Sequence, residues 1–350
     1  MRINRDQIIL SRKKQLQFSY HRARGHTLSY LRNRAIWYYF PRFHILTDFP
    51  NHVDLEISSA CDLKCPMCYT QTTEFKQLVK KQFMDFELFR SLVDECVRYK
   101  AYSIRVSLRG EPFLHPEVIQ MIRYAKNAGI KEVASLTNNY RLNPEMFEQA
   151  MKAGLDWLTV SFDGLGETYE RVRKPAKFEE SVSKIKEYKR IKDKARSVKP
   201  VLKVQSVWPA IKDCAAEYYQ FFEPYVDMVA SNPLIDYLQK DEDIEYVEDF
   251  DCPVLYQRMA VGSDGIAICT NDELGECAFG DANGESLHSI WHNKRATEAR
   301  CLHREHRGYK ELVMCQKCYL PRKTQSVVER IGDRKIEVEK YIGRVEEIGR

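Results

Sequence analysis

The feature that most constrains the fold is a regular alternation, between residues 52 and 232, of short β-branched segments with longer amphipathic ones. This alternation predicts repeated βα units around a parallel sheet. We expect strands at His52–Ser59, Ser103–Arg109, Glu132–Asn138, Trp157–Asp163, Val201–Val207 and Met228–Ser231. We expect helices at Asp85–Tyr99, Pro116–Asn127, Pro144–Ala153, Phe178–Lys194 and Ile211–Phe222, where apolar residues recur three or four positions apart. Six units in about 180 residues predict an α/β fold with a partial (β/α)6 TIM-like barrel, because a complete eightfold barrel takes about 250 residues.

The rest of the sequence divides at changes of composition. A basic, aromatic-rich arm comes first, with helices predicted at Asp6–Tyr20 and Thr27–Tyr39. A polar, acidic linker separates the barrel from a cysteine-bearing segment, and a charged tail follows, in which apolar spacing predicts one or two surface helices. The predicted boundaries are 1–50 for the arm, 51–235 for the barrel, 236–251 for the linker, 252–323 for the cysteine-bearing domain and 324–350 for the helical tail.

Eleven cysteines indicate metal binding. No run approaches the roughly 18 apolar residues of a membrane span, and the start of the sequence lacks the apolar core of a signal peptide. We therefore expect a cytoplasmic protein, and in a reducing compartment so many clustered cysteines favour metal sites over disulfides.

Three cysteines follow the first predicted strand, at Cys61, Cys65 and Cys68, with the spacing C-x3-C-x2-C. Three thiolates from one tight loop can hold three irons of a [4Fe–4S] cube and leave the fourth iron open to a ligand. The alternative is a zinc knuckle, but structural zinc takes four ligands and no nearby His completes this set.

This loop and the segments that follow later strands resemble the radical SAM superfamily, whose C-x3-C-x2-C loop follows the first strand of a partial barrel. Leu108-Arg109-Gly110-Glu111-Pro112 resembles the family's GGEP segment, which takes the amino group of S-adenosylmethionine (SAM), although Arg109 replaces its first glycine. The resemblance implies further SAM-binding residues at Thr137, Asn138, Ser161, Asp163 and Arg173, each near the end of a predicted strand or shortly after it. The resemblance also implies that a reduced [4Fe–4S] cluster cleaves SAM to a 5′-deoxyadenosyl radical, which abstracts hydrogen from unactivated carbon.

A second cysteine group lies in the C-terminal segment and ends in Cys315-Gln316-Lys317-Cys318. A terminal C-x2-C with distant upstream cysteines suits either a zinc ribbon or an iron–sulfur cluster. The segment resembles the SPASM/twitch extension of radical SAM barrels, and this resemblance implies one auxiliary [4Fe–4S] cluster on Cys252, Cys269, Cys315 and Cys318. Cys277 is left as a cluster ligand, a catalytic hydrogen-atom donor or a residue without a role.

The sequence does not decide what the basic arm contacts. Residues 1–50 carry ten Lys and Arg against two Asp, interleaved with aromatic rings. We expect its helices to pack their rings on the barrel with their charges in water, or to contact a membrane surface or lipid-linked substrate. Docking of an acidic flavodoxin- or ferredoxin-type electron donor is a further alternative, and nucleic acid is disfavoured.

Two functions compete. The first is an oxidoreductase or epimerase that acts on a small polar substrate, such as a sugar, aminocyclitol or nucleotide-sugar alcohol, by dehydrogenation or epimerisation. The second is a SPASM-type peptide maturase that modifies a ribosomally made precursor. A leader-binding module of the winged-helix type does not fit the 50-residue arm, which favours the small substrate.

Overall fold

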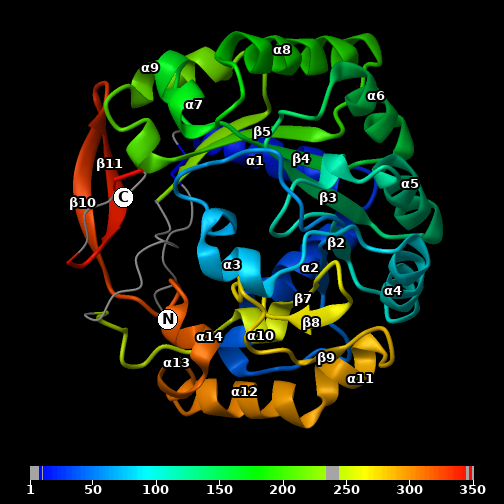
Figure 1. Ribbon diagram of the computed structural model, residues 1–350. Coiled ribbons are helices and arrows are strands. Elements are labelled where there is room, and N and C mark those ends of the chain that lie inside the picture. Colours follow the sequence, from blue (N-terminus) through cyan, green and yellow to red (C-terminus); the bar gives the residue numbers. More distant parts are fainter. Residues whose placement is uncertain (1–7, 10, 234–243, 344–346, 349–350) are drawn as a thin grey trace.

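The computed structural model describes residues 8–9, 11–233, 244–343 and 347–348 (Figure 1). Most of the predicted linker, residues 236–243, and the start of the first predicted helix lie outside the described residues. Among the helices that the structure describes, none is long and apolar enough to cross a membrane.

All six predicted barrel strands form, and each is parallel to its neighbours. Their order across the sheet is β6-β5-β4-β3-β2-β1. They are β1 (His52–Leu55), β2 (Ser103–Arg105), β3 (Glu132–Thr137), β4 (Trp157–Ser161), β5 (Val201–Val207) and β6 (Met228–Asn232). Most end a few residues earlier than predicted because the strand-end residues turn into the loops that form the site. In Figure 1 the strands curve around the centre of the molecule and the longer helices that connect them lie outside, so the partial barrel is confirmed.

The outer helices are amphipathic, and each packs its apolar side on the sheet. In α4, for example, Phe89, Leu92 and Val93 are buried, and the Asp85 side chain caps the first turn by accepting from two backbone N–H groups. The helices around the barrel are α4 (Phe86–Arg98), α5 (Val118–Ala128), α6 (Pro144–Ala153), α7 (Gly166–Val172), α8 (Phe178–Lys194) and α9 (Ala215–Phe222). Shorter segments at the strand ends are η2 (Tyr69–Gln71), α3 (Thr73–Leu78), η3 (Pro112–Leu114) and η4 (Trp208–Ala210).

The cysteine-bearing segment extends the barrel sheet. Its first strand, β7 (Arg258–Val261), pairs parallel with β1 on the edge opposite β2, and two antiparallel strands continue outward, β8 (Ile266–Ile268) and β9 (Gly280–Asp281). One nine-stranded sheet therefore runs through both parts of the chain. The accompanying helices are α10 (Val254–Gln257), α11 (Leu287–His292), α12 (Lys294–Arg304), α13 (Gly308–Glu311) and α14 (Val313–Lys317).

The arm folds into α1 (Arg12–Ala23), α2 (Thr27–Tyr39) and η1 (Pro41–Phe43), and Figure 1 shows both α-helices behind the barrel strands. Phe18 packs on Val201, at the start of β5. Arg22 makes two hydrogen bonds of 2.9 and 2.7 Å to the buried carboxylate of Glu132, at the start of β3. Packing of the arm on the barrel is thus confirmed, but Arg22 is buried in an ion pair rather than left in water.

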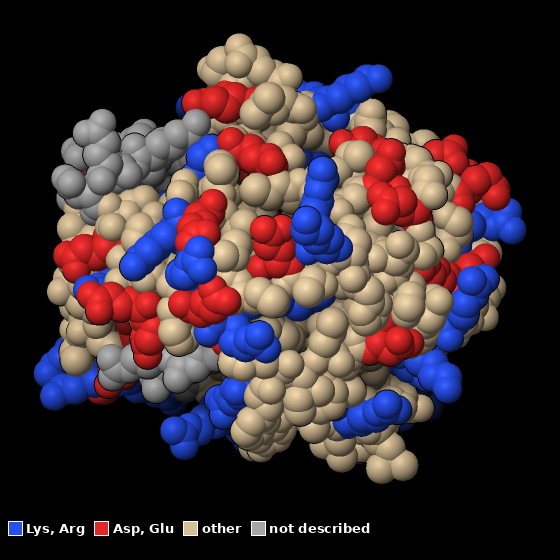
Figure 2. Space-filling model, turned by 90° about the horizontal axis from the view of Figure 1, so that it is seen from below, with Lys and Arg blue, Asp and Glu red and all other residues tan. Residues whose placement is uncertain are grey.

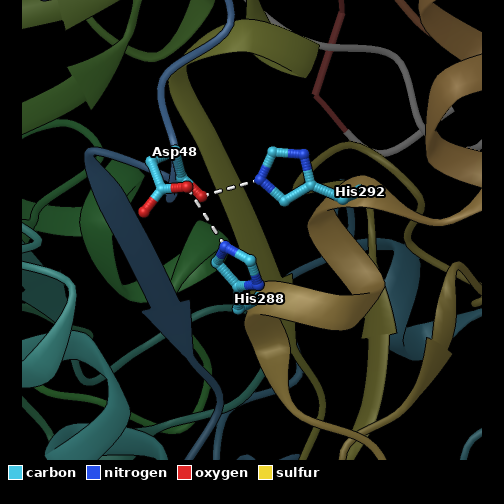
Figure 3. A group of neighbouring side chains, drawn as sticks. All are labelled: Asp48, His288 and His292. Carbon is cyan, nitrogen blue, oxygen red and sulfur yellow. Dashed lines mark hydrogen bonds and ion pairs between the residues drawn. The ribbon is translucent and has the colours of Figure 1, made fainter.

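An ion pair and a hydrogen bond join the end of the arm to the auxiliary region (Figure 3). His288 Nε2 lies 3.2 Å from a carboxylate oxygen of Asp48, and His292 Nε2 lies 2.8 Å from its backbone carbonyl. The side-chain ligand atoms of Asp48, His288 and His292 also lie close enough to one another to hold a metal ion. Because both ring nitrogens already have partners on Asp48, we interpret the group as a structural link.

The prediction of a helical tail is wrong. Residues 324–341 form an antiparallel hairpin of β10 (Thr324–Ile331) and β11 (Arg334–Tyr341), at the left of Figure 1. Its two-residue turn is Gly332-Asp333, with Gly332 at φ +57°, and such Gly-Asp turns favour hairpins. In β11, Ile336 and Val338 are two positions apart and both less exposed than the residues beside Ile336, which is the spacing of a strand.

Candidate active site

The three loop cysteines share one cavity with most of the predicted SAM-binding residues. This cavity, of about 290 Å³, lies beyond the carboxyl ends of the barrel strands, where α/β barrels bind their ligands. Its lining includes Cys61, Cys65, Cys68, Gly110, Glu111, Thr137, Asn138, Ser161 and Arg173. Of the predicted SAM-binding residues, Asp163 alone does not line the cavity; it pairs with Arg173 at 2.5 Å.

Glu111 is the most constrained side chain of this cavity. Its carboxylate is buried and accepts hydrogen bonds from Thr137 Oγ1 at 2.9 Å and from the backbone N–H groups of Asn138 at 2.7 Å and Phe113 at 3.1 Å. Burial raises the pKa of Glu111 to about 7, although the three donors favour the charged form. A carboxylate held in this way can receive an ammonium group from the cavity.

Gly110 brings this segment against the cysteine loop. A Cβ atom at this position would stand 2.4 Å from the backbone oxygen of Ser58 and 2.5 Å from that of Ala60, so no larger residue fits without a backbone shift. The N–H of Glu111 also donates to the Ala60 carbonyl at 2.8 Å. The glycine is therefore needed to set the distance between Glu111 and Cys61.

Two polar side chains approach the loop thiols. Asn138 Nδ2 lies 3.6 Å from Cys61 Sγ and 2.9 Å from Asp62 Oδ1. Arg173 lies 3.7 Å from Cys65 Sγ while it pairs with Asp163. These donors would stabilise thiolates at Cys61 and Cys65, which are the form that binds iron.

The second predicted set, Cys252, Cys269, Cys315 and Cys318, lines one small apolar cavity in the auxiliary region. Burial raises the pKa of the Cys315 thiol, and the neighbouring Cys252 and Cys269 raise it further. Thiols that oppose one another's ionisation in this way become thiolates only when a cation binds among them. The arrangement therefore fits a four-cysteine metal centre.

Two further side chains surround this set. Asn271 Nδ2 lies 3.7 Å from Cys318 Sγ, and His303 Nε2 lies 3.3 Å from Cys315 Sγ. Burial lowers the pKa of His303 to about 4, so the ring is neutral and can donate to sulfur. No motif in the sequence singles out His303, because its contact with Cys315, twelve residues later, depends on how the two short helices that follow His303 pack.

Cys277 lines neither this cavity nor the ones above the barrel, as far as the described residues show. Its backbone N–H donates to Asp272 Oδ2 at 2.9 Å, and the residue is half-buried. The structure gives Cys277 no contact that supports its predicted function as hydrogen-atom donor.

A further cavity of about 310 Å³ lies inside the barrel and shares residues with both sites. Leu108, Arg109 and Leu136 line it together with the SAM-side cavity, and Asn271 lines it together with the auxiliary cavity. Its other lining side chains are mostly polar: Arg105, Thr159, Lys203, Gln205, Asn232, Arg258, Thr270, Asp272 and Glu273. The alternation of Lys203 and Gln205 in β5 could have signalled a polar interior, since residues two apart face the same side of a strand.

Comparison with known proteins agrees with this geometry. Residues 55–198 match the model of the radical SAM superfamily, and residues 252–319 match the SPASM iron–sulfur cluster-binding domain. The chain therefore belongs to the radical SAM superfamily and carries a C-terminal SPASM-type domain.

Curated relatives match about two fifths of this chain. The tungsten-containing aldehyde ferredoxin oxidoreductase cofactor-modifying protein of Pyrococcus furiosus is 31% identical over 143 residues, which are 37% of this chain and 39% of that protein. The AdoMet-dependent heme synthase of Methanosarcina barkeri is 30% identical over 142 residues, 40% of this chain and 39% of that protein. The matched region thus spans about two fifths of the length of these relatives.

Solved structures share the fold over a longer region. BtrN in complex with AdoMet and 2-DOIA superposes with a TM-score of 0.57 at 15% identity, covering 77% of this chain and 93% of BtrN. Streptococcus suis SuiB bound to its precursor peptide SuiA gives a TM-score of 0.60 at 13% identity, covering 79% of this chain and 72% of SuiB.

The family implies a [4Fe–4S] cluster with SAM at the barrel and an auxiliary iron–sulfur cluster in the SPASM domain. The residues present fit both. Three thiols share a cavity with a buried carboxylate that can take the SAM ammonium group, and four thiols surround a second, apolar cavity. We assign the seven cysteines to these clusters as a proposal.

We predict that affinity for SAM rises with pH through about 7 and levels above it, because Glu111 must be ionised to bind the SAM ammonium group. Glu111→Gln should weaken binding about 10- to 100-fold, the loss of one charge-assisted hydrogen bond, and should abolish this pH dependence. The measurement is equilibrium dialysis of SAM with the reconstituted protein between pH 6 and 8, with the exposed Glu167→Gln as control. Equal affinity of wild type and Glu111→Gln would refute the assignment.

Proposed function

We propose that this protein cleaves SAM reductively and uses the resulting 5′-deoxyadenosyl radical to abstract hydrogen from a small polar molecule. A sugar, aminocyclitol or nucleotide-sugar alcohol is the substrate class that we favour, with dehydrogenation or epimerisation as the outcome. The observation that carries this proposal is the polar cavity inside the barrel, which adjoins the SAM-side cavity at Leu108, Leu136 and Asn232.

The size and lining of this cavity support a small substrate. A volume of about 310 Å³ suits a compact ligand, and small-molecule sites in proteins start near 300 Å³. The lining offers amide, hydroxyl, carboxylate and cationic groups, which would bind a molecule with many hydroxyl groups. BtrN, whose fold is similar over 93% of its own chain, is crystallised in complex with AdoMet and 2-DOIA.

Oxidation of an alcohol also needs a base for the hydroxyl proton, and the cavity offers one. Glu273 lines the cavity from the auxiliary region, and burial raises its pKa to about 7. A carboxylate with that pKa can accept a proton near neutral pH. When bound, the auxiliary cluster would supply an acceptor for the remaining electron. Glu273 lies on the side of the cavity where Asn271 connects it to the auxiliary cysteines, so proton and electron would leave in the same direction.

A peptide maturase is the alternative, because the fold of SuiB, which is crystallised with a precursor peptide, is also similar. The cavity volume favours the small molecule over an extended peptide segment. An electron donor is also required; on the face seen in Figure 2, acidic and basic side chains are interspersed, so this face does not by itself favour an acidic protein.

We predict that Cys61→Ala, Cys65→Ala and Cys68→Ala each abolish formation of 5′-deoxyadenosine from SAM under reducing, anaerobic conditions, because each removes a ligand of the cluster. The matched control is Cys214→Ala, which changes a half-buried cysteine at the start of α9 and should retain activity. Chromatographic quantification of 5′-deoxyadenosine is the measurement. Persistent product in the three loop variants would overturn the proposed function.

We further propose that the outer face of the arm contacts an anionic membrane surface. Residues 8–47 contain eight Lys and Arg and no Asp or Glu. Most of the large apolar side chains that the structure shows as exposed lie here: Leu16, Tyr20, Leu28, Leu31, Tyr38, Tyr39, Phe43 and Ile45. Leucines among arginines and tyrosines suit the lipid interface better than nucleic acid, since aliphatic side chains do not stack on bases.

Sedimentation with lipid vesicles tests this contact. The protein should bind vesicles that contain phosphatidylglycerol more tightly than pure phosphatidylcholine vesicles, and the double variant Leu28→Glu/Leu31→Glu should bind them at least tenfold more weakly. Val328→Glu changes an equally exposed apolar residue in β10 and serves as control. Unchanged binding in the double variant, or a preference for RNA over vesicles, would refute a membrane role of the arm.

A further inference from the structure

We propose that the substrate carries an acidic group, a phosphate or a carboxylate, which binds to Arg105, Lys203 and Arg258 at the floor of the barrel cavity. This inference rests on the proposed function, because it describes what the same cavity binds. The experiment below measures anion binding without SAM, so the two proposals can fail separately.

The floor of the cavity carries more positive than negative charge. Arg105 Nε lies 2.7 Å from one carboxylate oxygen of Asp54, and Arg258 lies 4.0 Å from the other. Lys203 has no carboxylate within ion-pair distance among the described residues, and its ammonium instead contacts Gln205 Oε1 at 2.5 Å. The Asp54 carboxylate, which His52 also contacts at 3.0 Å, is therefore shared by Arg105 and Arg258 and does not reach Lys203.

The other charged groups of the cavity do not neutralise this excess. Arg109 is occupied by Glu56, with two hydrogen bonds of 2.6 Å. Asp272 and Glu273 line the cavity from the auxiliary region, and among the described residues neither carboxylate forms an ion pair with Arg105, Lys203 or Arg258. The excess positive charge therefore stays near Lys203.

Unpartnered donors belong to residues that line the same cavity. Arg258 Nε and Trp157 Nε1 are buried and lack a hydrogen-bond partner, and both residues line the cavity. A buried N–H group without a partner costs about 1–3 kcal/mol, so such groups indicate an acceptor that completes the site. A group with several acceptor oxygens would satisfy both donors and the Lys203 ammonium at once.

The buried lysine agrees with this geometry. Burial, together with the positive charges of Arg22 and Arg105, lowers the pKa of Lys203 to about 7. An anion beside it would restore the charged form. A lysine that only fills space in the barrel would leave the buried Arg258 Nε and Trp157 Nε1 of the same cavity without an acceptor.

The position of the floor also sets the length of the substrate. Trp157 begins β4 and Ser161, which lines the SAM-side cavity, ends it. Four residues of a strand span about 13 Å. An acidic group at the floor would therefore place carbon atoms of a sugar-sized body between the floor and the SAM-side cavity.

Binding of small anions to the reconstituted protein, in the absence of SAM, tests the proposal. Isothermal titration calorimetry with inorganic phosphate and, separately, acetate should show saturable binding to wild type at constant ionic strength set with chloride. Lys203→Met and Arg258→Met should each weaken it at least tenfold. Lys212→Met, which changes an exposed lysine beyond β5, should leave it unchanged. Binding of SAM by the variants serves as the check that they are folded, because the SAM-side cavity does not include these residues.

The possible results distinguish a phosphate from a carboxylate on the substrate. They also test the acidic substrate separately from the proposed function. Binding of phosphate alone indicates a phosphorylated substrate, and binding of acetate as well indicates a carboxylate. Absence of saturable binding to wild type, or equal binding to Lys203→Met and wild type, overturns the inference. If 5′-deoxyadenosine still forms in that case, the proposed function stands and only the acidic substrate is refuted.

Discussion

The buried carboxylate of Glu56, directly after β1, connects the parts of the molecule that must meet at the site. It accepts two hydrogen bonds of 2.6 Å from Arg109, which precedes Gly110 and Glu111. It also accepts from the backbone N–H of Ser263 at 3.1 Å, in the turn between β7 and β8. A paired carboxylate at full burial is costly to break, by about 3–5 kcal/mol when one partner is removed. The substitution of the family's first glycine by Arg109 thus adds a link between barrel and auxiliary region, which Arg109 extends by donating to the Glu273 carbonyl at 3.2 Å.

Strand β1 lies at the boundary between the barrel and the auxiliary region, which this link crosses. It pairs with β2 on one side and β7 on the other, so the loop that follows it, with Cys61, lies where the barrel and the SPASM domain meet. The cavity between the two cysteine sets is a consequence of that pairing. A radical formed at the SAM-side cavity would then face a substrate held by the barrel interior, with the proposed auxiliary centre on the other side.

Residues at strand ends could be predicted from the sequence because the parallel βα pattern fixes where strands end, and the motif residues Glu111, Asn138 and Ser161 follow there. Lys203, Arg258 and Trp157 could not be brought together in this way, because their proximity depends on strand register and on the parallel pairing of β7 with β1, which no local pattern encodes. The helical prediction for the tail is wrong for another reason: the Gly332-Asp333 turn joins two strands, and this local signal outweighs the apolar spacing of the flanking residues. His303 and Glu56 are buried polar residues whose partners lie far along the chain, so their roles emerge only from the packing.

We propose that this chain builds two separate cysteine-bound iron–sulfur centres on either side of one substrate cavity. An anaerobic crystal structure of the reconstituted protein with SAM, with anomalous diffraction recorded at the iron edge, tests it most directly. The account predicts two iron clusters, one bound by Cys61, Cys65 and Cys68 with SAM on its open iron beside Glu111, and one bound by Cys252, Cys269, Cys315 and Cys318. A single cluster, or zinc instead of iron at either cysteine set, would contradict it.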